Sequence, residues 1–134
     1  MFMSIQSIYP DICANDLAAS RGFYTDLLGL EVTFESDWYV ALQAADQPSV
    51  QLALVAAGHS SVPTAYRTSP GGVLISFEVD DATAFHDRAL ELGLVLAQPL
   101  RDEEFGQRHF IAVDPDGLLV DVIETLFVPD SESS

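Results

Sequence analysis

The chain of 134 residues is long enough for one domain, or for two small modules that share a core, without disulfide bonds. Five arginines, no lysines and 21 acidic residues give a formal net charge of −16, which excludes nucleic acid and anionic membranes as partners because both require basic side chains. The single cysteine, Cys13, excludes an intrachain disulfide, and no basic residue precedes Arg21, so we expect no secretory signal and a cytoplasmic protein.

The first elements in chain order are a strand over residues 5–14 and a helix that follows it. Pro10 has no N–H for a strand ladder, so this strand should lie at an edge or carry a bulge. Asn15-Asp16 provides a helix N-cap, and Gly29 ends the apolar helical pattern that begins at Leu17. Three short strands should follow, at 31–35, 38–43 and 50–55.

The same order of elements recurs 65 residues further on. A strand over 73–79 leads to a helix that is capped by Asp80-Asp81 and ends at Gly93. Three more strands are expected at 95–100, 108–113 and 118–124, the last two joined by the turn sequence Asp114-Pro115-Asp116-Gly117.

This repetition predicts an α+β fold of two tandem βαβββ modules. The first module would span 5–55 and the second 73–126, with 56–72 as the connection and 127–134 as an acidic tail. A helix covers one face of each four-stranded sheet, so we expect curled mixed sheets around a cup for a small molecule, with the helices outside.

Several motifs resemble the vicinal oxygen chelate superfamily, which includes glyoxalase I, extradiol dioxygenases and bleomycin-resistance proteins. The similarity covers about residues 5–126. The matching segments are Asp16-Leu17-Ala18-Ala19-Ser20, Phe23-Tyr24, Leu27-Leu28-Gly29-Leu30, Phe77-Glu78-Val79-Asp80-Asp81, Phe105-Gly106-Gln107-Arg108-His109-Phe110 and Asp114-Pro115-Asp116-Gly117.

The resemblance implies four positions at which metal-dependent relatives hold an ion. In this sequence they are Tyr9, Gln51, Leu74 and Asp121. Leu74 has no donor atom, Gln51 is a weak neutral ligand, and Tyr9 ionises only near pH 10. A catalytic divalent site normally needs three good ligands, so we predict no metal and no other cofactor.

No other set of residues predicts catalysis. His59 lies in the connection, and we expect His86 on the outward side of the second helix. His109 is expected on a strand near the cup, as a wall residue or as a base or ligand paired with Asp121 or Asp11. Cys13 has no adjacent histidine and is interpreted as a packing residue.

The remaining feature is an aromatic cup with a few polar points. Phe34 and Phe110 fit either the cup or the core, whereas Trp38 and Phe105 are expected in the cup. Phe105 precedes a glycine where bleomycin-resistance proteins tend to have an aromatic–Gly pair. The predicted ligand-binding residues are Tyr9, Asp11, Phe34, Trp38, Gln51, Leu74, Phe105, His109, Phe110 and Asp121.

Three functions are compatible with this reading. The resemblance favours a metal-free protein that sequesters an aromatic or drug-like compound, as antibiotic-resistance relatives do. The alternatives are a metal-dependent lyase, isomerase or dioxygenase with a rearranged site that uses His109 and Asp121, and an interaction module with an occluded cup. Relatives are commonly homodimers, so we expect a homodimer, with or without exchanged strands.

Overall fold

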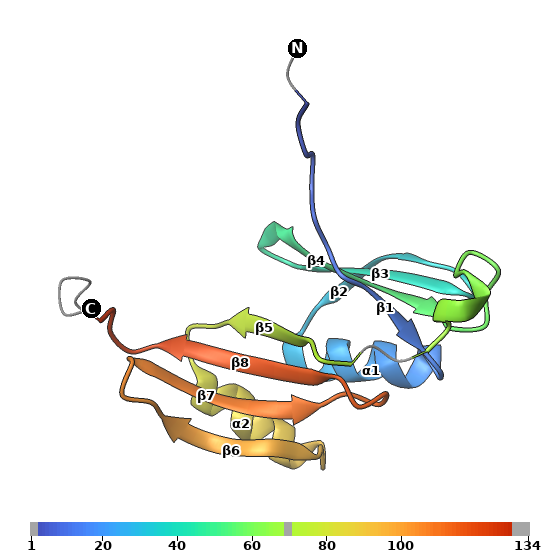
Figure 1. Cartoon of the computed structure of the whole chain (residues 1–134). Helices are drawn as coiled ribbons and strands as arrows, with labels where there is room; N and C mark the ends of the chain where they lie inside the picture. The colour runs from blue at the N-terminus through green and yellow to red at the C-terminus, as the bar shows by residue number, and fades with distance from the viewer. Residues whose placement is uncertain (1–2, 69–70, 130–134) are drawn as a thin grey trace. The chain divides into compact units, whose positions relative to one another are not determined.

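The polypeptide builds the same βαβββ arrangement twice (Figure 1). The computed structural model describes residues 3–68 and 71–129, and the chain divides into two units with the boundary between positions 70 and 71. This confirms the α+β class and the tandem modules. The cup between the modules stays a prediction.

The first module has a mixed sheet with the strand order β1-β4-β3-β2. The strand β1 is parallel to β4, while β2, β3 and β4 are antiparallel neighbours. The elements are β1 (Asp11–Ala14), α1 (Leu17–Leu28), β2 (Glu31–Glu35), β3 (Tyr39–Ala44) and β4 (Gln47–Ala56), followed by a short 3-10 turn, η1 (Thr64–Tyr66), in the connection.

The helix α1 begins and ends where the sequence predicts. The carboxylate of Asp16 accepts a hydrogen bond from the Ala19 N–H at 3.1 Å, and Gly29 ends the helix. The side chains of Tyr24 and Leu27 are fully buried, and α1 packs against β3 and β4. One face of the first sheet is therefore part of the core.

The second module repeats this topology with the strand order β5-β8-β7-β6. Again the first strand is parallel to the last, and the other pairs are antiparallel. The elements are β5 (Leu74–Glu78), α2 (Ala82–Glu91), β6 (Leu96–Asp102), β7 (Gln107–Val113) and β8 (Leu119–Thr125).

The helix α2 covers one face of the second sheet. It is capped by Asp81, whose carboxylate accepts from the Ala84 N–H at 3.1 Å, and it packs against β6, β7 and β8. Phe110, Val120 and Val122 are fully buried residues of this core. As predicted, a turn joins β7 to β8, closed by a bond from the Gly117 N–H to the Asp114 carbonyl at 3.0 Å.

The first strand is shorter than the predicted 5–14. It begins at Asp11, and residues 3–10 form no regular element, with Ile5 90% and Ile8 88% exposed. Its edge position confirms the expectation from Pro10. Within the predicted acidic tail, 130–134 lie outside the described residues.

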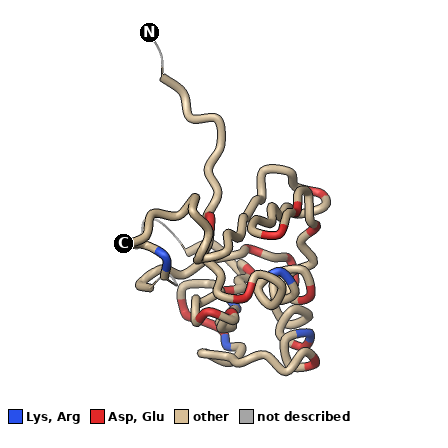
Figure 2. The backbone as a smooth tube through the Cα atoms, turned by 90° about the vertical axis from the view of Figure 1, so that its right-hand side faces the viewer, with Lys and Arg blue, Asp and Glu red and all other residues tan. Residues whose placement is uncertain are grey.

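Acidic residues occur throughout the trace, and basic residues are few (Figure 2). In the part of the chain that the structure describes, no helix has both the length and the apolar character needed to cross a membrane.

Candidate functional site

Each sheet has a second face that its own helix does not cover, called here the open face of the module. Side chains alternate along a strand, so the neighbours of core residues lie on this face. In the first module Val40 and Leu42 are buried in the core, and Tyr39 and Ala41, which alternate with them along β3, lie on the open face.

The open face of the first module contains a hollow of about 190 Å³. Two predicted ligand-binding residues, Tyr9 and Gln51, line it together, and each lies two residues before the first register pair of β1 and β4, Asp11 with Ala53. The complete lining is Tyr9, Thr33, Tyr39, Ala41, Leu42, Gln43, Gln51, Leu52 and Ala53.

Two tyrosines and a carboxylate interact at this hollow. Burial raises the pKa of Tyr39, as do the negative charge of Asp11 and a hydrogen bond with Tyr9. Burial also raises the pKa of Asp11, which pairs with Ala53 in the strand register and lies two residues from Tyr9. The predicted residues Tyr9 and Asp11 therefore lie together.

The predicted aromatic residues Phe34 and Trp38 both lie next to Tyr39, which lines the hollow. Phe34 is 57% exposed, and the centroid of its ring lies 6.2 Å from that of Tyr39. The Trp38 ring lies 5.6 Å from Tyr39, and its plane stacks on the imidazole of His59 at 3.7 Å. Trp38 thus has an aromatic partner from the connection and is not a lining residue of the hollow.

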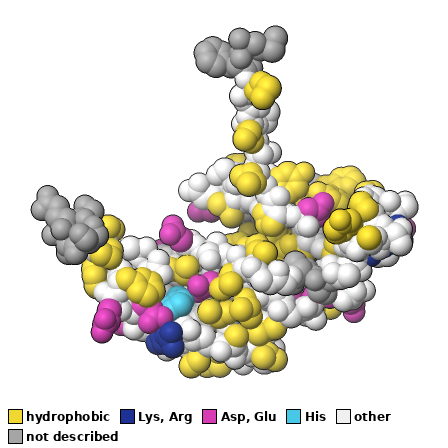
Figure 3. All heavy atoms as spheres, in the orientation of Figure 1, with side chains coloured by type: hydrophobic (Ala, Val, Ile, Leu, Met, Phe, Trp, Pro, Cys, Tyr) yellow, Lys and Arg dark blue, Asp and Glu magenta, His cyan; other side chains and the backbone are white. Residues whose placement is uncertain are grey.

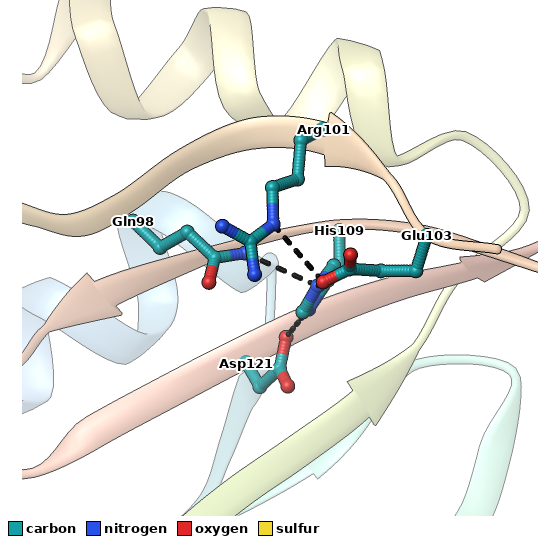
Figure 4. A network of polar contacts seen from close by, with 5 residues as sticks. All are labelled: Gln98, Arg101, Glu103, His109 and Asp121. Carbon is teal, nitrogen blue, oxygen red and sulfur yellow. Dashed lines mark hydrogen bonds and ion pairs between the residues drawn. The ribbon is translucent and has the colours of Figure 1, made fainter. Parts of the chain in front are cut away.

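On the open face of the second module, His109 stands between two carboxylates (Figure 4). Its Nδ1 lies 2.8 Å from Asp121 Oδ1 and its Nε2 lies 2.8 Å from Glu103 Oε2. Arg101 Nε donates to the same Glu103 oxygen at 3.0 Å, and the Gln98 amide nitrogen lies 3.1 Å from His109 Nε2. We call these five residues the His109 cluster.

The two neighbouring carboxylates favour the charged form of the His109 ring. An ionised carboxylate only accepts hydrogen bonds, so Asp121 and Glu103 favour a proton on both ring nitrogens, which makes the ring an imidazolium. Burial acts to lower the pKa of His109, but the hydrogen bonds and charges of Glu103 and Asp121 outweigh it, and the net effect is a raised pKa. Hydrogen bonds from His109 and Arg101 lower the pKa of Glu103. In Figure 3 a histidine reaches the surface among acidic and basic side chains.

The other predicted residues of the second module do not join this cluster. Leu74 on β5 is 48% exposed, and Phe105, in the turn before β7, is 54% exposed. Phe110 is fully buried, and its ring makes an edge contact with His86 at 5.4 Å, so Phe110 belongs to the core under α2. The expectation that His86 faces outward is wrong, because its side chain is only 16% exposed.

The residues present do not fit the metal site of the resemblance. Tyr9, Gln51 and Leu74 supply no strong donor, and Asp121 is hydrogen-bonded to Nδ1 of His109, whose Nε2 is engaged by Glu103. Among residues 3–68 and 71–129, no group of three or more His, Cys, Asp or Glu side chains is placed to hold an ion. The predicted pairing of His109 with Asp121 is present, as a hydrogen bond within the cluster.

Sequence reasoning missed Tyr39 and Glu103. Tyr39 alternates with Ala41 and Gln43 along β3, a signal that was available once the strand was assigned. Glu103 lies in the turn between β6 and β7, where no period indicates a direction, so only the structure identifies it as a partner of His109.

Comparison with known proteins reveals many solved structures of the same fold. A protein of unknown function from Agrobacterium tumefaciens is 28% identical, with 93% of this chain and 98% of that chain covered and a TM-score of 0.73. A glyoxalase/bleomycin resistance protein/dioxygenase from Nocardioides is 22% identical, with coverages of 97% and 90% and a TM-score of 0.72. A lactoylglutathione lyase from Agrobacterium tumefaciens is 23% identical, with coverages of 91% and 96% and a TM-score of 0.67.

The sequence itself identifies the family. No curated protein matches the chain significantly. The model of the glyoxalase/bleomycin resistance protein/dioxygenase superfamily matches residues 5–122, which is most of both modules. The chain belongs to the glyoxalase/bleomycin resistance protein/dioxygenase superfamily.

Proposed function

We propose that the protein binds a small aromatic compound on the open face of the first module, without a metal ion and without converting it. The observation that carries this proposal is the hollow lined by Tyr9 and Tyr39. A cavity of about 150 Å³ holds benzene, so a hollow of about 190 Å³ has room for a single aromatic ring. Tyrosine rings offer stacking surfaces, and Gln43 and Gln51 offer amide groups to a polar substituent.

The charge beside the hollow favours a cationic ligand. Asp11 is an exposed residue, but the desolvation of its carboxyl group raises its pKa and disfavours the bare carboxylate. A cation that enters the hollow would relieve this cost and would also interact with the negative faces of the tyrosine rings. The preferred ligand is therefore a flat aromatic cation, such as an amidine or a protonated amine.

The family supports a sequestering role of this kind, because its members include bleomycin resistance proteins. Sequestration needs a binding surface only, which agrees with the poor set of metal donors. We propose that the protein acts in the cytoplasm, as a homodimer, and that its ligand is a drug or another aromatic compound.

Calorimetry with benzamidine and benzamide tests the proposal, because the two compounds have the same shape and differ in charge. We expect benzamidine to bind more tightly, and Asp11→Asn to remove that preference. Tyr39→Ala should weaken the binding of both compounds about fivefold, because the loss of one aromatic contact costs roughly 1 kcal/mol.

Tyr66→Ala is the matched control, because Tyr66 lies in the connection and is 73% exposed. Equal losses in Tyr39→Ala and Tyr66→Ala would show that the hollow is not the binding site. Elemental analysis of protein purified without chelators should find no stoichiometric metal, and one tightly held divalent ion per chain would contradict the metal-free part of the proposal.

A further inference from the structure

Two cationic groups in the second module point at one carboxylate oxygen. Glu103 Oε2 accepts from His109 Nε2 at 2.8 Å and from Arg101 Nε at 3.0 Å (Figure 4). The His109 side chain is 10% exposed and that of Glu103 19% exposed, whereas Arg101 is 57% exposed. The arrangement lies at the edge of the open face, where a dissolved molecule has access to Arg101.

Glu103 is not needed to fix the imidazole. Asp121 already accepts from Nδ1 at 2.8 Å, which sets the ring orientation and provides one negative charge for it. The Glu103 carboxylate therefore neutralises a second positive charge, that of Arg101. The contact with Glu103 uses the Nε group of Arg101, and a guanidinium has further N–H groups suited to a second carboxylate oxygen.

Glu103 is attached so that its side chain can leave without a change in the fold. The residue lies in the turn between β6 and β7, where its N–H donates to the Gln107 carbonyl at 2.7 Å and its carbonyl accepts from Gly106 at 3.0 Å. Both anchors involve the backbone alone. A rotation of the side chain would release the carboxylate and leave Arg101 and His109 facing an empty anion position.

We propose that Arg101 and His109 form a binding site for the carboxylate of a small ligand, and that Glu103 occupies this site in the ligand-free protein. Glu103 acts as an internal competitor, because its carboxylate has the same chemistry as the ligand and is tethered next to the donors. Binding to the native protein is therefore weak, and it strengthens when Glu103 is removed. This site is separate from the hollow of the first module and does not depend on the proposed function.

Benzoate and acetate are the probes. Their binding is monitored through the imidazole resonances in proton–nitrogen correlation spectra of the full chain. The variant His109→Gln identifies the His109 signals among those of the three histidines. In the native protein, benzoate should shift the His109 signals in a saturable manner. Glu103→Ala should bind benzoate at least about tenfold more tightly, which corresponds to one hydrogen bond to a charged group.

Glu104→Ala is the matched control, because Glu104 is the exposed neighbour in the same turn and should leave benzoate binding unchanged. Arg101→Gln in the Glu103→Ala background should abolish binding. If Glu103→Ala does not fold, Glu103→Gln preserves the shape of the side chain and removes its charge, and it should also bind benzoate more tightly than the native chain.

Two results would overturn the proposal. The first is an unchanged His109 signal in the native protein at the highest soluble benzoate concentration, which would make the contact with Glu103 purely structural. The second is equal benzoate affinity of the native protein and the folded Glu103 variant, which would show that Glu103 does not compete for the position.

Discussion

The imidazole of His109 is a nearly buried charge in a chain with only three histidines. Burying a charge is costly unless hydrogen-bonded counter-charges accompany it. Asp121 on one side and Glu103 on the other provide them, and the ring becomes a fixed positive point on the open face of the second module. Loss of either carboxylate should therefore destabilise the protonated form of the His109 ring.

The stability that His109 contributes should depend on pH in a defined direction. Its pKa in the folded protein is raised above the ordinary value of 6.5, so its contribution is complete below that pH and is lost as the pH rises through the raised pKa. Each unit of pKa difference corresponds to about 1.4 kcal/mol. Urea unfolding of the native protein and His109→Gln should give a difference in unfolding free energy that shrinks as the pH rises above 6.5.

Glu103 should determine how the free energy of unfolding changes at acid pH. Its pKa is lowered from 4.5, so its contribution is present above that value and disappears as the pH falls through the lowered pKa. A stability difference that grew with pH above 6.5 would contradict the charged assignment of the ring.

At the scale of single residues, the sequence predicted which side chains lie near the hollow and in the His109 cluster better than it predicted which groups they contact. Tyr9, Asp11 and Gln51 were placed by strand alternation and family position, and the structure brings them to one region. Phe110, for which the sequence left the cup and the core open, lies in the core, because alternation gives two faces but does not state which one the helix covers.

The turn between β6 and β7 is held at Gly106 by the chain that follows β8. Gly106 has φ 96°, and its carbonyl accepts hydrogen bonds from the N–H groups of Leu126 and Phe127 at 2.8 and 3.3 Å. A Cβ added at this position would lie 2.2 Å from the Phe127 carbonyl oxygen. The turn that carries Glu103 is thus closely packed against another segment.

Gly106→Ala should destabilise the protein more than Gly117→Ala. Both positions have positive φ, which costs an alanine on the order of 1 kcal/mol, but a Cβ at Gly117 meets no atom within 4 Å. The difference between the unfolding free energies of the two variants in urea measures the cost of the close approach to Phe127. Equal destabilisation would indicate that the chain at Phe127 moves away from the new side chain at little cost in free energy.

The cap of α2 offers a second comparison within one element. Asp81→Ala removes the acceptor of the Ala84 N–H and should cost about 1 kcal/mol of unfolding free energy. Asp80→Ala changes the exposed neighbour and should alter stability by only a few tenths of a kcal/mol. A similar loss in both variants would assign the effect to charge instead of capping.

The elements themselves were largely predictable. Cap residues and glycines fixed both helices, and β2 coincides with the predicted range of 31–35. The first strand was overestimated because apolar alternation continues through Ile8, although β1 pairs with β4 only from Asp11 onward. Alternation indicates which residues suit a strand, but a partner strand decides where pairing starts.

At the scale of the whole molecule, the net charge of −16 should influence how ligands arrive. A negative field attracts cations over a distance that shortens as salt is added. The association rate of benzamidine should therefore fall with increasing ionic strength, while that of benzamide stays nearly constant in stopped-flow measurements of tyrosine fluorescence.

Benzoate should show the opposite salt dependence, because the same field repels an anion until it reaches Arg101 and His109. A rate of benzamidine association that does not respond to salt would show that the overall charge has no part in ligand capture.

The short pairing of β1 also has a consequence for handling the protein. Among the described residues, β1 pairs with Ala53–Ala56, so the outer edge of β4 from Gln47 to Leu52 has no strand beside it, and residues 3–10 remain extended with Ile5 and Ile8 in water. A bare strand edge next to an apolar segment is a template for intermolecular β-pairing. Concentrated samples should therefore be prone to aggregation at this edge, and a lysine in place of Ile8 should keep them in solution for longer.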